Sequence, residues 1–158
     1  MELNTRGRYA VMAIADLARA CAESGSIPLS AIAERQMISL AYLEQLFAKL
    51  RRANLVESER GRGGGYRLAR AASTITVAEV MAAVAENTDM TRCGVEAGAP
   101  CLAGKRCLTH HLWEQLGDHI DEFLASVTLQ QLIDGNVGRR MPTIQAPPVV
   151  FTGGIVRR

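Results

Sequence analysis

The chain has few aromatic residues and lacks any long hydrophobic run. Aromatic residues make up 4% of its 158 residues, whereas hydrophobic residues make up 48% and are mostly alanine, leucine, isoleucine and valine, as in small packed helices. No apolar run approaches the roughly 18 residues that span a membrane, and no signal peptide opens the sequence. We therefore expect a cytoplasmic protein with no membrane partner. In that reducing compartment, cysteines serve as metal ligands more often than as disulfide partners.

The sequence also lacks the residue sets that catalysis requires. It contains no paired carboxylates, no nucleophile–base set and no Cys-x-x-Cys motif. Asp118, His119 and Asp121 are close in sequence, but consecutive positions of a helix point in different directions. We predict that the chain is not an enzyme and has no small-molecule substrate.

Basic and acidic residues are unevenly distributed along the chain. Residues 1–70 carry eleven Lys and Arg against seven Asp and Glu, whereas residues 71–135 carry three against nine. The tail, residues 136–158, has four arginines and no acid. The basic first part suits a polyanionic partner, and we interpret it as a DNA-binding region only in combination with a motif.

Helical periodicity in residues 1–52 predicts a helix-turn-helix. The inward stripe of the expected first helix consists of Ala10, Ala13, Ile14, Leu17, Ala18 and Cys21. Cys21 is thus predicted to be a core residue rather than a ligand. A short helix from Leu29 should end near Met37, and Ser39 should cap a longer helix. The inward face of that longer helix consists of Leu43, Leu46, Phe47 and Leu50.

A glycine-rich hairpin should follow the helix-turn-helix as a wing. Residues 55–59 and 65–69 are the expected strands, and the connection between them is rich in glycine, which permits a tight turn with positive φ. Arg60 and Arg62 lie at its tip. A phosphate-binding loop is disfavoured because no GKS or GKT ending follows. A further helix is expected over residues 76–84.

These elements predict how DNA is read. The side chains expected nearest the major groove are Ser39, Ala41, Tyr42, Glu44 and Gln45. Phosphate contacts are expected from Tyr42, Lys49, Arg51 and Arg52, a minor-groove insertion from Arg60 and a backbone contact from Arg62. Gln45 could pair with adenine and Glu44 with cytosine N4. A carboxylate near phosphate is repelled unless a base donor meets it, so a small shift of the helix could change which sites Glu44 permits; a surface ion pair of Glu44 is the alternative.

Three thiols and an imidazole follow within eighteen residues, as Cys93-x7-Cys101-x5-Cys107-x2-His110. Such soft donors suit a 2Fe–2S cluster or zinc. With His111 in place of His110 the spacing resembles small zinc fingers that bind RNA. No aromatic residue lies between Cys93 and Cys107 to stack on bases, which disfavours that alternative.

An apolar seam marks the helix that follows. It consists of Trp113, Leu116, Ile120, Phe123 and Val127, at spacings of 3, 4, 3 and 4. We predict that this helix pairs with its copy in a homodimer, because a DNA reader benefits from two half-sites; a helix that merely faces the core is the alternative. The organisation expected is a winged helix-turn-helix over 1–85, a ligand loop over 86–110, a dimerisation helix and a short helix over 111–135, and a tail over 136–158.

Several strings resemble the iron–sulfur cluster regulators among the winged helix-turn-helix bacterial transcription factors. They are residues 6–10 (RGRYA), 39–47 (SLAYLEQLF), 60–66 (RGRGGGY), 91–93 (TRC) and 107–113 (CLTHHLW). The resemblance implies a mainly α fold with a β-hairpin wing, and a homodimer that binds double-stranded operator DNA. It further implies one 2Fe–2S cluster per subunit on Cys93, Cys101, Cys107 and His110, and control of cluster-assembly genes as a repressor or activator.

Two features bear on the resemblance. The interval between Cys93 and Cys101 is longer than the five residues that the family leads us to expect, and the tail diverges. A nitric-oxide-sensing branch of the same family is the alternative, and it uses three cysteines and a carboxylate near the N-terminus. That branch is disfavoured because position 8 is Arg8, with no acid beside it, and because His110 would have no task.

Overall fold

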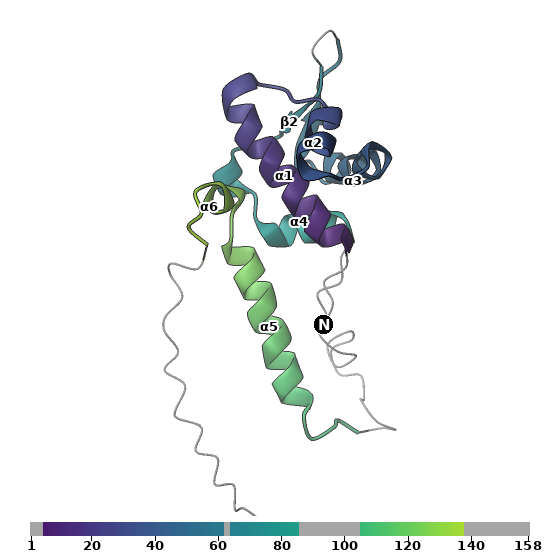
Figure 1. Cartoon of the computed structure of the whole chain (residues 1–158). Coiled ribbons are helices and arrows are strands. Elements are labelled where there is room, and N and C mark those ends of the chain that lie inside the picture. Colours follow the sequence, from purple (N-terminus) through teal and green to yellow (C-terminus); the bar gives the residue numbers. More distant parts are fainter. Residues whose placement is uncertain (1–4, 62–63, 86–104, 138–158) are drawn as a thin grey trace, which may run out of the picture.

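The computed structural model describes residues 5–61, 64–85 and 105–137. Its elements are α1 (Thr5–Ser24), α2 (Leu29–Gln36), α3 (Leu40–Arg52), β1 (Val56–Ser58), β2 (Tyr66–Leu68), η1 (Ala72–Thr74), α4 (Val77–Ala83), α5 (His110–Ser126) and α6 (Leu129–Ile133). Figure 1 shows one body built from α1 to α4 and the hairpin, with α5 projecting from it and α6 returning beside α1. The mainly α fold with a hairpin is therefore confirmed. Within the described ranges, every helix is too short or too polar to span a membrane.

Helix α1 forms the centre of the core. Four residues of its predicted stripe (Ala10, Ala13, Ile14 and Leu17) have no exposed surface, and Ala18 is nearly as buried. Cys21 is half-buried and packs against the same core, as its place on the stripe predicted. Helices α2, α3, α4 and α6 all pack against α1. Removal of these apolar side chains from water is the main term that holds the body together.

The predicted helix-turn-helix is present as α2 and α3. Helix α2 ends where Met37 adopts a left-handed conformation, with φ 52°, and its N–H bonds to carbonyls of the last turn. Ser39 then caps α3, because its hydroxyl accepts a hydrogen bond from the N–H of Tyr42 at 3.3 Å. The inward face of α3 is the predicted one: Leu43, Leu46, Phe47 and Leu50 are buried.

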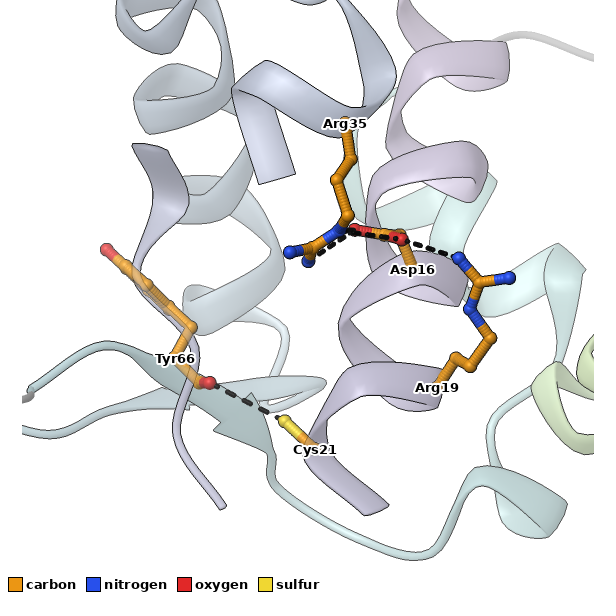
Figure 2. A network of polar contacts seen from close by, with 5 residues as sticks. All are labelled: Asp16, Arg19, Cys21, Arg35 and Tyr66. Atoms are coloured by element: carbon orange, nitrogen blue, oxygen red, sulfur yellow. Dashed lines mark hydrogen bonds and ion pairs between the residues drawn. The ribbon is translucent and has the colours of Figure 1, made fainter. Parts of the chain in front are cut away.

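An ion pair between a buried carboxylate and an exposed arginine fixes α2 to α1. Asp16 lies on α1 with only 4% of its surface exposed, and Arg35 of α2 donates to it from Nε at 2.9 Å and from Nη2 at 2.7 Å. Arg19, one turn along α1, makes a longer contact of 3.3 Å to the same carboxylate. Figure 2 shows the two guanidinium groups on either side of Asp16. The hydrogen bond to Asp16 raises the pKa of the Arg35 guanidinium.

The wing depends on close backbone approaches. Strands β1 and β2 pair antiparallel, with Glu57 opposite Arg67 at the centre. The backbone of Ile27, just before α2, also bonds to Tyr66 of β2 in both directions, at 2.7 and 2.8 Å. A Cβ at Gly65 would overlap the Ile27 backbone, and one at Gly64 would lie 2.5 Å from a carbonyl oxygen. Glycine is therefore required where the wing joins the helix-turn-helix.

Helix α5 is joined to the body through its C-terminal end. Just beyond it, the backbone around Thr128 pairs antiparallel with the backbone around Thr76. Each threonine also begins a helix, Thr76 for α4 and Thr128 for α6, with a complete capping box. The chain thereby returns to the first part of the molecule, and Leu129 of α6 is fully buried in the main core.

Candidate nucleic-acid interface and metal ligands

The exposed face of α3 presents most of the side chains that were predicted to reach the major groove. Ser39, Ala41, Glu44 and Gln45 are all exposed. A groove of about 430 Å³ separates this face from the wing, and Glu44 and Gly64 line its two sides. Carboxylate and amide groups on an exposed helix beside a projecting hairpin can form hydrogen bonds to base edges.

Two of the predicted DNA-binding side chains are partly engaged within the chain. Tyr42 is half-buried, and its ring meets that of Tyr9 edge-to-face at a centroid distance of 6.1 Å. Lys49 is also half-buried, and its Nζ donates to the carbonyl oxygen of Val84 at 3.4 Å. Both assignments to phosphate stay predictions, and Lys49 already has a protein partner.

The basic cluster that ends α3 is accessible. Arg51 and Arg52 are exposed, and Arg51 donates from Nη1 to the Ser58 hydroxyl at 3.3 Å, which ties the end of α3 to β1. Arg60 is exposed at the base of the wing tip, whereas Arg62 falls outside the described residues. These cations can attract phosphate along one edge of the groove.

No role was predicted for Arg67 from the sequence, although Arg67 forms ion pairs with two carboxylates of the wing. Its Nη2 lies 2.6 Å from Glu57 and its Nε 2.9 Å from Glu59. Arg67 thereby offsets two carboxylates that would otherwise repel DNA. The signal was present as the opposite charges of residues 57 and 67, but it becomes readable only once the strand register is known.

Two of the four predicted metal ligands lie in the described residues. Cys107 is half-buried, and its carbonyl accepts a hydrogen bond from the N–H of His110 at 3.1 Å, at the start of α5. Cys93 and Cys101 lie outside the described residues. Within the described part of the chain, no three donor groups come together in a metal-binding arrangement. A thiol and an imidazole held one helical turn apart fit either a 2Fe–2S cluster or zinc.

The two neighbouring histidines have different surroundings. His110 is 3% exposed, whereas the side chain of His111 is 78% exposed. Glu114 lies one turn further along, with Oε2 3.2 Å from Nδ1 of His111 and Oε1 3.7 Å from Nε2 of His110. Of the two histidines, His110 is therefore the buried one, and its backbone N–H is the one that bonds to the Cys107 carbonyl.

Thr109 links the ligand end of α5 to its apolar seam. Its hydroxyl oxygen accepts a hydrogen bond from the indole Nε1 of Trp113 at 3.2 Å and lies 3.6 Å from the sulfur of Cys107. Sequence reasoning missed this threonine, because hydroxyl contacts depend on geometry rather than on periodicity. Cys21 lies far away on α1, where burial raises the pKa of its thiol, so it is a poor metal ligand at neutral pH.

The predicted dimerisation seam is only partly exposed. Trp113 and Leu116 are each 37% exposed, and Ile120 and Phe123 are half-buried. Val127 lies just beyond the end of α5 in an extended conformation and is 5% exposed against Val77 and Met81 of α4. The open apolar surface is therefore at the N-terminal half of α5, next to the ligand pair.

Comparison with known proteins places these features in a family. A family model named Rrf2, described as iron-dependent transcriptional regulator, matches residues 3–135. The HTH-type transcriptional regulator IscR of Escherichia coli is 48% identical over 151 residues, which cover 93% of this chain and 91% of that protein. The solved structure of T. potens IscR has a TM-score of 0.69 at 34% identity and covers 90% of this chain and 93% of its own.

A second structural neighbour has a different regulatory role. CymR, the global cysteine regulator of B. subtilis, has a TM-score of 0.72 at 30% identity, and the match covers 85% of this chain and 98% of CymR. These matches show a winged-helix regulator rather than an enzyme. Because one fold serves both an IscR and a cysteine regulator, what this chain senses must be argued from its own donor residues.

Proposed function

Because the chain belongs to the Rrf2 family of iron-dependent transcriptional regulators, we propose that it is a homodimeric sensor of iron–sulfur cluster status. In this proposal it carries one 2Fe–2S cluster per subunit and binds double-stranded operator DNA in the cytoplasm. It controls the genes of cluster assembly, as a repressor at some promoters and as an activator at others.

The observation that carries the proposal is the difference between the two histidines of α5. His110, in the position of the fourth donor three residues after Cys107, is buried, whereas His111, which the zinc-finger spacing would require, is exposed. With Cys93 and Cys101 from the sequence, the donors are three thiols and one imidazole, which is the number that a 2Fe–2S cluster needs. The first test must therefore distinguish a 2Fe–2S cluster from a zinc ion bound to the same donors.

The donor set also suits a sensor. A bound 2Fe–2S cluster supplies redox and oxygen sensitivity, and one neutral imidazole in place of a thiolate raises its potential. Among the residues of this chain, His110 would supply the imidazole and Cys93, Cys101 and Cys107 the thiolates, and replacing one thiolate by a neutral donor should weaken the hold on the cluster. A sensor of cluster supply requires a cluster that the protein releases readily.

The dimer is proposed from the exposed part of the seam. Trp113 and Leu116 lie on the projecting helix with over a third of their surface open, and Leu112 beside them is 60% exposed. Pairing of two such helices would bury this surface and place two α3 helices on successive half-sites. Trp113 is the single tryptophan of the chain, so tryptophan fluorescence reports on this part of α5.

The test is anaerobic purification followed by iron, sulfide and zinc analysis, an absorption spectrum and an operator-binding assay. We expect visible absorption bands, about two irons and two sulfides per chain, and DNA affinity that changes when the cluster is removed. His110→Ala should lose the cluster, whereas the matched control His111→Ala should keep it. One zinc per chain that cluster reconstitution does not displace would refute the sensing role and leave a DNA-binding regulator with a structural metal.

The oligomeric state needs its own measurement. Sedimentation should give a dimer for the wild-type chain, and Leu116→Glu should give a monomer with a red-shifted Trp113 emission. A monomeric wild type at micromolar concentration would contradict the dimer without affecting the metal proposal.

A further inference from the structure

The C-terminal end of α4 is bound by cations from two other helices. Helix α4 ends at Ala83, and the next residues are Val84, which is buried, and Ala85, which has a left-handed φ of 55°. Lys49 of α3 donates to the Val84 carbonyl at 3.4 Å, and Arg6 of α1 donates to the Ala85 carbonyl at 3.5 Å. Basic side chains satisfy terminal carbonyls and complement the negative end of the helix dipole.

Lys49 differs from the other cations of the recognition helix. Arg51 and Arg52 are exposed, whereas Lys49 is half-buried with its ammonium group directed onto a backbone carbonyl. A lysine that served only to hold phosphate would be expected to extend into water like its two neighbours. The contact therefore gives Lys49 a role within the protein.

The acceptor of this bond, the Val84 carbonyl, lies shortly before the predicted metal ligands in the sequence. After Val84 and Ala85 the sequence continues into the segment that contains Cys93 and Cys101. Helix α4 also packs against α5, which begins with His110, and against α3. Helix α4 thus contacts both α3, the recognition helix, and α5, which begins with the predicted ligand His110. In sequence, the end of α4 is followed by the segment that contains the other two predicted ligands, Cys93 and Cys101.

We propose that Lys49 is a positioning residue that couples the metal-ligand segment to the recognition helix through the Val84 carbonyl. This inference rests on the proposed sensing function. A change in the ligand segment that moves Val84 alters its bond to Lys49, and because Lys49 belongs to α3, the orientation of α3 toward DNA changes with it. The bond thus supplies an interaction that differs between the two states, which any coupling between sites requires.

The experiment compares operator affinity in the cluster-loaded and cluster-free forms of full-length variants. Lys49→Met keeps the apolar stem and removes the donor, Lys49→Arg keeps a cationic donor, and Arg52→Met removes an exposed charge from the same turn of α3. The quantity measured is the ratio of the two affinities, together with the dependence of each on salt. A purely structural role would lower stability without changing this ratio.

We expect Lys49→Met to move the ratio toward one by about fivefold or more, and Lys49→Arg to restore most of it. Arg52→Met should weaken both forms equally and reduce the salt slope by about one unit for each phosphate that is no longer neutralised, whereas Lys49→Met should leave the slope unchanged. If Lys49→Met does not fold, Lys49→Leu, which also lacks a donor, replaces it with the same expected ratio.

The outcomes separate the inference from the function on which it rests. A wild-type ratio different from one that Lys49→Met leaves intact overturns the role of Lys49 and keeps the sensor. Equal weakening of both forms with a reduced salt slope makes Lys49 a phosphate ligand and also overturns the inference. A wild-type ratio of one overturns the sensor, and the coupling with it.

Discussion

Replacement of Asp16 by asparagine should destabilise the helix-turn-helix measurably. The Asp16 side chain is 2% exposed and accepts two short hydrogen bonds from Arg35. Asparagine keeps the shape but removes the charge, so the two bonds to Oδ2, at about 1.5–3 kcal/mol each with a carboxylate, weaken to bonds from Arg35 to an uncharged amide oxygen. Because the Arg35 side chain is 39% exposed and water can replace part of this interaction, we expect a net cost of about 2 kcal/mol.

Two further variants test whether the loss of stability comes from the short Arg35 bonds rather than from the longer Arg19 contact. Arg35→Met should cost more than Asp16→Asn, about 3 kcal/mol, because it leaves a buried carboxylate with only its weaker partner. Arg19→Met is the matched control: its side chain is 68% exposed and its contact is longer, so the cost should stay below about 0.5 kcal/mol.

Urea unfolding of the full chain, followed by far-ultraviolet circular dichroism, measures all three free energies of unfolding. The slope with urea should match the wild type, so that changes in midpoint report stability alone. If Arg19→Met cost as much as Arg35→Met, or if Asp16→Asn cost less than about 0.5 kcal/mol, the attribution of stability to the buried Arg35 bond would be refuted.

Three other perturbations follow from the backbone and the caps. Met37→Gly should stabilise the chain by about 1 kcal/mol in urea unfolding, because Met37 has a left-handed φ and is 93% exposed, so its packing contributes little; a loss of stability would contradict this reasoning. Gly65→Ala should cost at least about 2 kcal/mol and weaken DNA binding, since a Cβ would overlap the Ile27 backbone, and a neutral effect would count against the close approach. The Thr76 backbone N–H lowers the pKa of Glu79 below its ordinary 4.5, so Glu79 contributes stability above that value and loses it as the pH falls through its folded pKa. Glu79→Gln should therefore flatten the fall in stability below about pH 4.5, and an unchanged pH profile would exclude the capping carboxylate as its source.

Local pattern was sufficient for the DNA-reading part of the fold. The period of 3.6 residues predicted the buried faces of α1 and α3, Ser39 predicted the start of α3, and the glycines predicted the wing. These features depend on neighbours within a few residues, which a single sequence displays. The close approach of Gly65 to the Ile27 backbone, in contrast, could be identified only in three dimensions.

Long-range contacts were beyond such reasoning. Val127 continued the heptad spacing of α5, yet it leaves the helix and is buried because the backbone around Thr128 pairs with that around Thr76. Lys49 was predicted to contact phosphate because it is a basic residue of α3, but its ammonium group is directed onto the Val84 carbonyl after α4. Neither pairing has a local signal, since each joins segments more than thirty residues apart in the chain. Metal ligation, dimerisation and the base contacts stay predictions.

The return of α6 to the core has a consequence for how the protein is made. Leu129 is fully buried against residues of the first helices, so the core stays open until that leucine has been synthesised. Chains fold from the N-terminus as they leave the ribosome. All four predicted metal donors precede Leu129 in the sequence. A nascent chain therefore completes this core only after all four of the predicted donors have been made.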